Sequence, residues 1–177
     1  MRAIIIKKIP IREYDELVIC YTEKMGKQAY KARGILRPTS IQARHLDVLN
    51  IVDFNLVDGK GHPIITGAHC INGLNKLKSH LSALMAAFFV IDLANKLIME
   101  GESDEKLWHF LEDSLNNLDR AAARNETDWP VKLAMIKNNA ASTLGYKDWA
   151  RLEETTGVIL KSAEFQLSSQ MAGYMLK

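Results

Sequence analysis

The sequence has few cysteines. Two cysteines in 177 residues, Cys20 and Cys70, cannot form a disulfide framework, and neither belongs to a C-x-x-C pair. Each lies in an apolar, strand-like run, so a zinc site is not expected either. Both are predicted to be small buried side chains in a reducing cytoplasm.

Long apolar runs are also absent. The longest, Leu81 to Ile91, ends at Asp92 and is far shorter than the ~20 residues that span a bilayer. Lys7, Lys8 and Pro10 interrupt the first apolar run, so no secretory signal is expected. We therefore expect a soluble cytoplasmic protein. A carboxylate such as Asp92 in an apolar helix should cap a loop or pair with a Lys or Arg of the N-terminal half.

Catalytic motifs are missing as well. The sequence has no G-x-x-x-x-G-K-[ST], no G-x-G-x-x-G and no H-E-x-x-H. Among the five histidines, His62 and His69 share one expected strand, but seven residues apart they would point to opposite faces. We therefore expect no enzyme, no cofactor and no metal site.

The first seventy residues have the pattern of strands, with side chains that alternate between two faces. A turn sequence, Asp58-Gly59-Lys60-Gly61, joins the last two. Five short strands predict a small closed or part-open barrel, with a three-stranded sheet and irregular loops as the alternative. The expected strands are 3–9, 16–22, 27–33, 51–58 and 62–71.

From Gly73 onward the apolar spacing becomes helical. A largely apolar helix ends at Gly101, and Ser103-Asp104 offers an N-cap for the next one. Another helix follows Pro130, and a last one is expected from about Val158 to Tyr174. The fold class is therefore predicted as α+β. A five-stranded barrel over residues 1–72 precedes an α-helical bundle over residues 73–177.

Charge divides unevenly along the chain. Residues 1–80 hold 13 Lys and Arg against 7 Asp and Glu, and residues 81–177 hold 10 against 14. Such an asymmetry favours a polyanion partner for the first half, although a solvated surface without function is an equal alternative. Lys27, Lys31 and Arg33 alternate on one strand face, as a row that follows a phosphate backbone would. The other candidates are Arg37 and Arg44 just beyond, and Lys7, Lys8 and Arg12 if the first strand is adjacent.

Three tyrosines accompany this row. Tyr14, Tyr21 and Tyr30 are candidate stacking platforms for bases, but Tyr30 alternates against the lysines and is better interpreted as core. Taken alone, the basic row has a second interpretation, an edge strand that lysines protect against aggregation.

Several short motifs follow one another over nearly the whole chain. They are Arg12, Tyr14-Asp15-Glu16, Leu17 to Thr22, Gly26, Ala32-Arg33-Gly34, Arg37-Pro38-Thr39-Ser40, Leu84 to Glu102 and Leu144-Gly145-Tyr146. Their order and spacing resemble the RecO family of bacterial DNA repair proteins.

That resemblance implies an N-terminal OB-fold followed by a helical domain, in a cytoplasmic, nucleoid-associated recombination mediator. It implies binding to single- and double-stranded DNA, strand annealing, and partnership with RecR and the C-terminal tail of single-stranded DNA-binding protein, so that RecA is loaded. DNA contacts would come from Lys27, Lys31, Arg33, Arg37 and Arg44. Residues 147–157 lack the cysteines of the family's zinc site, as in a short zinc-free form, and Thr39 replaces a common lysine.

Two other hypotheses remain open. The acidic helical half suits a protein-interaction adaptor, and backbone contacts alone would also suit an RNA-binding OB protein. An acidic tail that ends in aromatic residues needs an apolar groove with a basic rim. Arg120, Arg124 and Lys132, three basic residues of the helical half, are the candidates for that basic rim.

Overall fold

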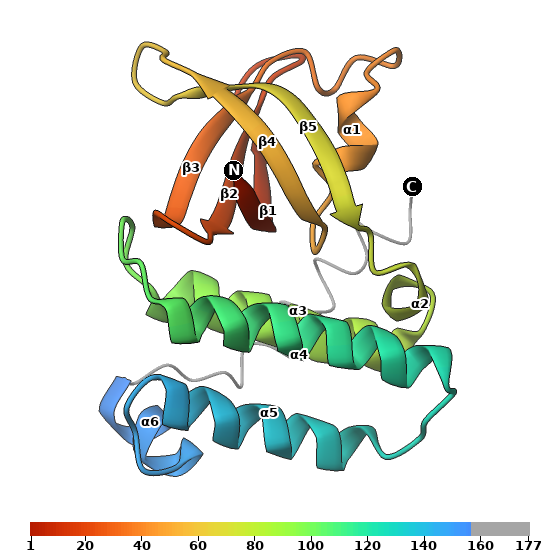
Figure 1. Cartoon of the computed structure of the whole chain (residues 1–177), viewed down its shortest axis with the longest axis vertical. Helices are drawn as coiled ribbons and strands as arrows, with labels where there is room; N and C mark the ends of the chain where they lie inside the picture. The colour runs from red at the N-terminus through yellow and green to blue at the C-terminus, as the bar shows by residue number, and fades with distance from the viewer. Residues whose placement is uncertain (157–177) are drawn as a thin grey trace.

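A computed structural model describes residues 1–156, in which five strands are followed mainly by helices (Figure 1). The predicted helix at Val158–Tyr174 lies outside the described residues. The strands are β1 (Arg2–Pro10), β2 (Glu16–Thr22), β3 (Gly26–Ala32), β4 (Ile51–Val57) and β5 (Ile64–Asn72). The helices are α1 (Gln42–His45), α2 (Asn75–Lys78), α3 (Leu81–Leu97), α4 (Glu105–Ala123), α5 (Trp129–Thr143) and α6 (Trp149–Thr156).

The strands form a closed barrel in the order β1-β2-β3-β5-β4, and β4 pairs with β1 to complete it. All pairs are antiparallel except β3 and β5, which run parallel over two residue pairs. A five-stranded closed barrel of this kind is an OB-fold. The predicted barrel is confirmed, and the three-stranded alternative is wrong.

Strand β1 explains why the chain opens with consecutive isoleucines. Ala3 and Ile5 point into the barrel, where they pack with Val18, Cys20 and other residues. Ile4 and Ile6 belong instead to a second apolar cluster, which includes the helices. A strand that is buried on both faces needs an unbroken apolar run, because neither set of side chains meets water.

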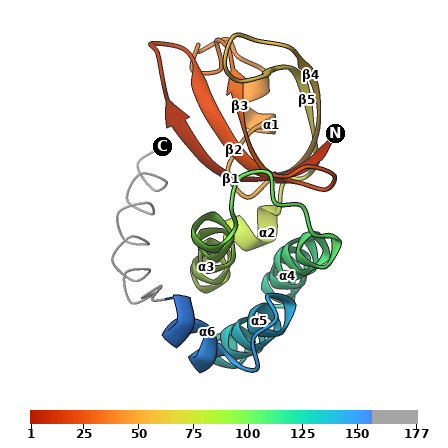
Figure 2. The ribbon, with the colours of Figure 1, turned by 90° about the vertical axis from the view of Figure 1, so that its left-hand side faces the viewer.

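Helix α1 lies beside the barrel, and the other helices lie below it, with α2, α3 and α4 next to the barrel and α5 and α6 farther away (Figure 2). Helix α3 is buried along most of its length, and no helix within residues 1–156 is long and apolar enough to cross a membrane. The predicted cap of α4 is confirmed, because the Asp104 carboxylate accepts the backbone N–H groups of Lys106 and Leu107. Asp92 pairs with Lys96 of its own helix at 2.8 Å and not with a cation of the barrel, which corrects the expected pairing.

A contact that we call the hairpin clamp joins the two halves; it comprises residues 21–27 and 98–104. The Tyr21 hydroxyl accepts the Asp104 N–H at 3.0 Å, and the Gly101 N–H donates to Lys27 O at 2.9 Å. The Ser103 hydroxyl donates to Lys24 O at 3.2 Å. Barrel and helices therefore share backbone contacts as well as an apolar cluster. The division at residues 72 and 73 stays a prediction, although the last strand ends at Asn72.

Candidate nucleic-acid interface

The end of the barrel away from the helical half carries four of the eight predicted DNA contacts. We call it the distal rim and define it as residues 11–15, between β1 and β2, and residues 31–37, where β3 ends and the next loop begins (Figure 1). Three of the predicted contacts are exposed there: Arg12, Arg33 and Arg37.

Asp15 holds the two parts of the distal rim together. Its carboxylate accepts the Gly34 N–H at 2.8 Å and pairs with the Lys31 ammonium at 3.3 Å. The Gly34 hydrogen bond is the main cause that lowers the pKa of Asp15 below its ordinary value of 3.8, and Lys31 adds to it against the effect of burial. Asp15 is therefore ionised at neutral pH and neutralises part of the Lys31 charge, so the three arginines carry the open positive charge of the rim.

Tyr14 of the distal rim contacts one of these arginines, Arg37. The guanidinium carbon of Arg37 is 5.4 Å from the centre of the Tyr14 ring, a cation–π contact, and the Leu36 N–H donates to Tyr14 O at 3.1 Å. Tyr14 is 39% exposed, whereas Tyr21 and Tyr30 are buried at 0% and 2%. Tyr30 as a core residue is therefore confirmed, and of the three predicted stacking platforms Tyr14 is the one open to a base.

Lys27 is far from the distal rim, at the start of β3 beside the helices. Its ammonium donates to the carbonyl oxygens of Asn95 and, at 3.1 Å, Ile98, so it caps the end of α3 within the hairpin clamp. Burial lowers the pKa of Lys27. The alternation along β3 predicted that Lys27 and Lys31 share a face. It did not predict that Lys27 would contact α3 whereas Lys31 pairs with Asp15 at the distal rim.

The remaining predicted contacts are dispersed. Lys8 pairs at 2.9 Å with the buried Glu16 carboxylate, and Lys7 is exposed in β1 opposite Ile19 of β2. Arg44 is exposed on α1, which packs beside β5. The barrel therefore brings together four of the eight predicted residues, Arg12, Lys31, Arg33 and Arg37.

Loop 58–63 between β4 and β5 was missed as part of the site. Its Lys60 and His62 are exposed, and the Lys31 N–H donates to Pro63 O at 2.9 Å, which places the loop beside the end of β3. The Asp58-Gly59-Lys60-Gly61 turn was recognised in the sequence. Its position next to the distal rim depends on barrel closure, which no local pattern shows.

A second candidate site is a groove between α4 and α5, with a volume of about 290 Å³. All three predicted basic residues, Arg120, Arg124 and Lys132, line it, and Leu118 and Met135 contribute apolar surface. The spacing of the basic residues in the sequence could not predict that they line one groove, because Lys132 lies on a different helix from Arg120.

Glu126 also lines this groove and opposes its positive charge. Its carboxylate lies 2.5 Å from the Lys132 ammonium and 3.7 Å from the Arg124 guanidinium. The hydrogen bonds that the Lys132 ammonium donates to the Glu126 and Asp128 carboxylates raise the pKa of Lys132. Among residues 1–156, no group of three or more His, Cys, Asp or Glu side chains could hold a metal ion.

A closed five-stranded barrel with this strand order defines an OB-fold protein. Residues 1–74 match the family described as Recombination protein O N terminal, which confirms the resemblance to the RecO family. The chain is 26% identical to the DNA repair protein RecO of Syntrophomonas wolfei over 145 residues, which are 82% of this chain and 56% of that protein. It is 25% identical to the RecO of Roseiflexus over 171 residues, 97% of this chain and 58% of that protein. The chain thus spans about half the length of the curated relatives that it matches.

Proposed function

We propose that this protein is a cytoplasmic recombination mediator in DNA repair, without covalent chemistry of its own. It binds single- and double-stranded DNA at the distal rim and anneals complementary strands. With RecR it helps to load RecA onto gaps coated by single-stranded DNA-binding protein. The observation that carries the proposal is the distal rim, where three exposed arginines and an exposed tyrosine share one end of an OB-fold barrel and Arg37 contacts the tyrosine ring.

The physical basis is the match between the distal rim and a flexible polyanion. Arg12, Arg33 and Arg37 supply charge for phosphates, and Tyr14 supplies a ring face on which a base can stack. Base–aromatic stacking contributes about 1–3 kcal/mol per base and tolerates any sequence. Phosphate contacts release counterions, so the affinity should fall steeply as salt increases.

The test is fluorescence anisotropy with a labelled single-stranded oligonucleotide across a salt series. Replacement of the three rim arginines by glutamine should lower the slope of log affinity against log salt by about two, since each single-strand contact contributes about 0.7. A matched control removes the same charge from three exposed lysines of the helical half that have no ion pair within residues 1–156: Lys76, Lys106 and Lys147. An unchanged slope in the rim variant, or an equal fall in the control, would contradict the proposal.

A second function is favoured by the groove between α4 and α5. We propose that it docks the acidic, aromatic-ended tail of single-stranded DNA-binding protein, with the aromatic group against Leu118 and Met135 and the carboxylates on the basic rim. Glu126 competes for the same cations, because it already pairs with Lys132 and Arg124. An incoming carboxylate must therefore displace it.

The competition between Glu126 and the tail predicts the direction in which each substitution changes the affinity for the tail. Glu126→Gln should tighten the binding of an acidic tail peptide by several-fold, because it frees both cations. Lys132→Glu should weaken the same binding. Glu153→Gln, an exposed glutamate of α6 without an ion pair among the described residues, is the control for charge. Weaker peptide binding by Glu126→Gln, measured by calorimetry, would exclude the groove as the docking site.

A further inference from the structure

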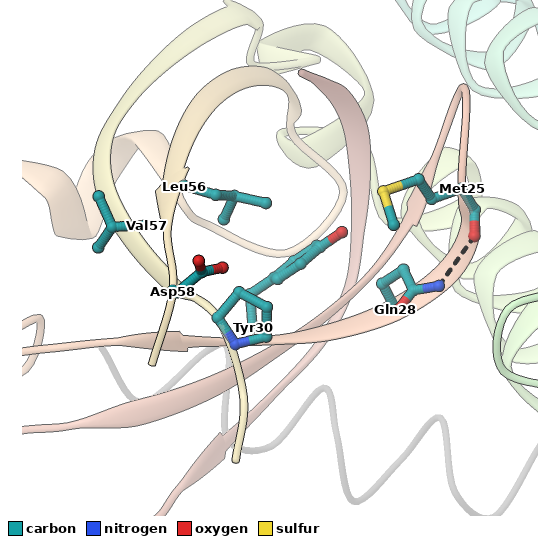
Figure 3. Close-up of a pocket in the computed structure, with 7 residues that line it drawn as sticks. Met25, Gln28, Tyr30, Leu56, Val57 and Asp58 are labelled. Atoms are coloured by element: carbon teal, nitrogen blue, oxygen red, sulfur yellow. Dashed lines mark hydrogen bonds between the residues drawn. The ribbon is translucent and has the colours of Figure 1, made fainter. Parts of the chain in front are cut away.

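A groove in the side wall of the barrel adjoins loop 58–63, which contributes Asp58 and Pro63 to its lining (Figure 3). Its volume is about 510 Å³, within the ~300–1,000 Å³ of small-molecule pockets. Tyr30, Leu56 and Pro63 contribute apolar surface, together with Met25 and Val57, which are 47% and 49% exposed. We call it the β3–β4 groove.

The barrel topology explains the opening. β3 pairs with β5 only at Lys31 with Ile64 and Ala32 with Ile65. The lower part of β3, which carries Gln28 and Tyr30, has no strand partner on that side, and the end of β4 forms the opposite wall. The groove is therefore a fixed result of strand order.

Tyr30 gives the groove a rigid aromatic wall. Its ring meets Phe54 edge to face at 5.3 Å between ring centres, and its hydroxyl lies 3.7 Å from the Met1 sulfur. Burial raises the pKa of Tyr30 to about 12, so this wall is uncharged at neutral pH.

Two hydrogen-bond acceptors lie among the apolar walls. The Asp58 carboxylate lies on one side of Tyr30 and Gln28 on the other (Figure 3). The Gln28 side-chain N–H donates to Met25 O at 2.9 Å, which orients the amide so that its Oε1 remains available as an acceptor. A ligand that fits this arrangement is flat, has apolar faces, and carries hydrogen-bond donors along its edge.

We propose that the β3–β4 groove binds one unstacked guanine base of single-stranded DNA. Guanine presents two adjacent donors, N1–H and N2–H₂, which a single carboxylate can accept together. Asp58 would accept this pair. The inference rests on the proposed DNA binding and adds a base preference to it.

The charges around the groove favour a base edge over a phosphate inside it. Asp58 repels a phosphate, whereas exposed cations flank both walls: Lys24 next to Met25, and Lys60 in loop 58–63. Neither lysine has an ion pair within residues 1–156. The flanking nucleotides can therefore keep their phosphates on these cations while the base enters the groove.

The test compares three labelled single strands in anisotropy measurements on the full chain. One is a thymine 15-mer, one has a central guanine, and one has a central hypoxanthine, which lacks only the N2 amino group. The guanine strand should bind at least about fivefold more tightly than the hypoxanthine strand, the lower end of what a bidentate contact contributes. Asp58→Asn should abolish this ratio, because the amide offers one acceptor, and should leave thymine binding intact.

Asp113→Asn, the same change at an exposed position of α4, should leave the ratio unchanged. Circular dichroism shows whether each variant is folded. Equal affinity for the guanine and hypoxanthine strands, with salt-dependent thymine binding, overturns this inference alone. Absence of binding to all three strands overturns the proposed function and this inference with it.

Discussion

Gly26 is the position where one added methyl group should matter most. It lies at the turn between β2 and β3 with φ of +64°, and a Cβ atom there would lie 1.8 Å from Glu102 O and 2.8 Å from Ser103 N. Both are backbone atoms of the hairpin clamp. Gly26→Ala therefore combines two costs, a left-handed backbone for alanine and a forced displacement of the link between α3 and α4.

The two costs can be separated within the same chain. Alanine in the left-handed region costs about 1–2 kcal/mol. The link must also move until contact distances are normal, and such overpacking costs about 1–3 kcal/mol. Gly34 has nearly the same φ, +63°, but its nearest neighbours are side-chain atoms of Arg37 at 3.6 Å. Gly34→Ala should therefore show the first cost alone.

The assay is urea unfolding followed by circular dichroism. We expect Gly34→Ala to lower the free energy of unfolding by about 1–2 kcal/mol, and Gly26→Ala by about 2–5 kcal/mol. For a chain of this length each kcal/mol lowers the melting temperature by about 2–4 °C, so thermal scans give an independent measurement. Equal destabilisation by the two variants would show that the close approach at the hairpin clamp is wrong.

Two further predictions concern charged groups of the barrel. Asp15 has a lowered pKa in the folded state, so it stabilises the fold above its unfolded value of 3.8, and this contribution is lost as the pH falls through the lower folded value. Asp15→Asn should lower the free energy of unfolding by about 1 kcal/mol at pH 7 and make the loss of stability below about pH 4 less steep. An acid unfolding curve as steep as that of the unmodified chain would contradict this. Lys27→Met should cost about 1–2 kcal/mol of stability, because it removes the donor to Asn95 O and Ile98 O, yet leave the affinity for single-stranded DNA within about twofold. A large loss of affinity with unchanged stability would restore Lys27 as a DNA contact.

Local pattern predicted the architecture of this chain well. Alternation over β2 separated Val18 and Cys20, which are inside the barrel, from Tyr21, which is outside it. The N-cap at Asp104 followed from residue type and position alone. These features depend on neighbours in the sequence, which is why a single sequence was sufficient for them.

Positions along a strand predicted a shared face, but not a shared environment. Lys27 and Lys31 lie on the same face of β3, yet Lys27 caps α3 and Lys31 pairs with Asp15 at the distal rim. The ion pairs could not be predicted from the sequence pattern either. Lys8 of β1, for example, pairs with Glu16, which belongs to another strand.

The sequence by itself determined the barrel and the order of strands and helices along the chain, because alternation, helical spacing and turn residues act over a few positions. Only the tertiary structure decided which basic residues stay open to a ligand. It placed Arg12, Arg33 and Arg37 at one end of the barrel, assigned Lys27 to the hairpin clamp, and brought loop 58–63 beside β3. The physical reason is that ion pairs, caps and groove walls form between segments far apart in the chain, and barrel closure alone sets those distances.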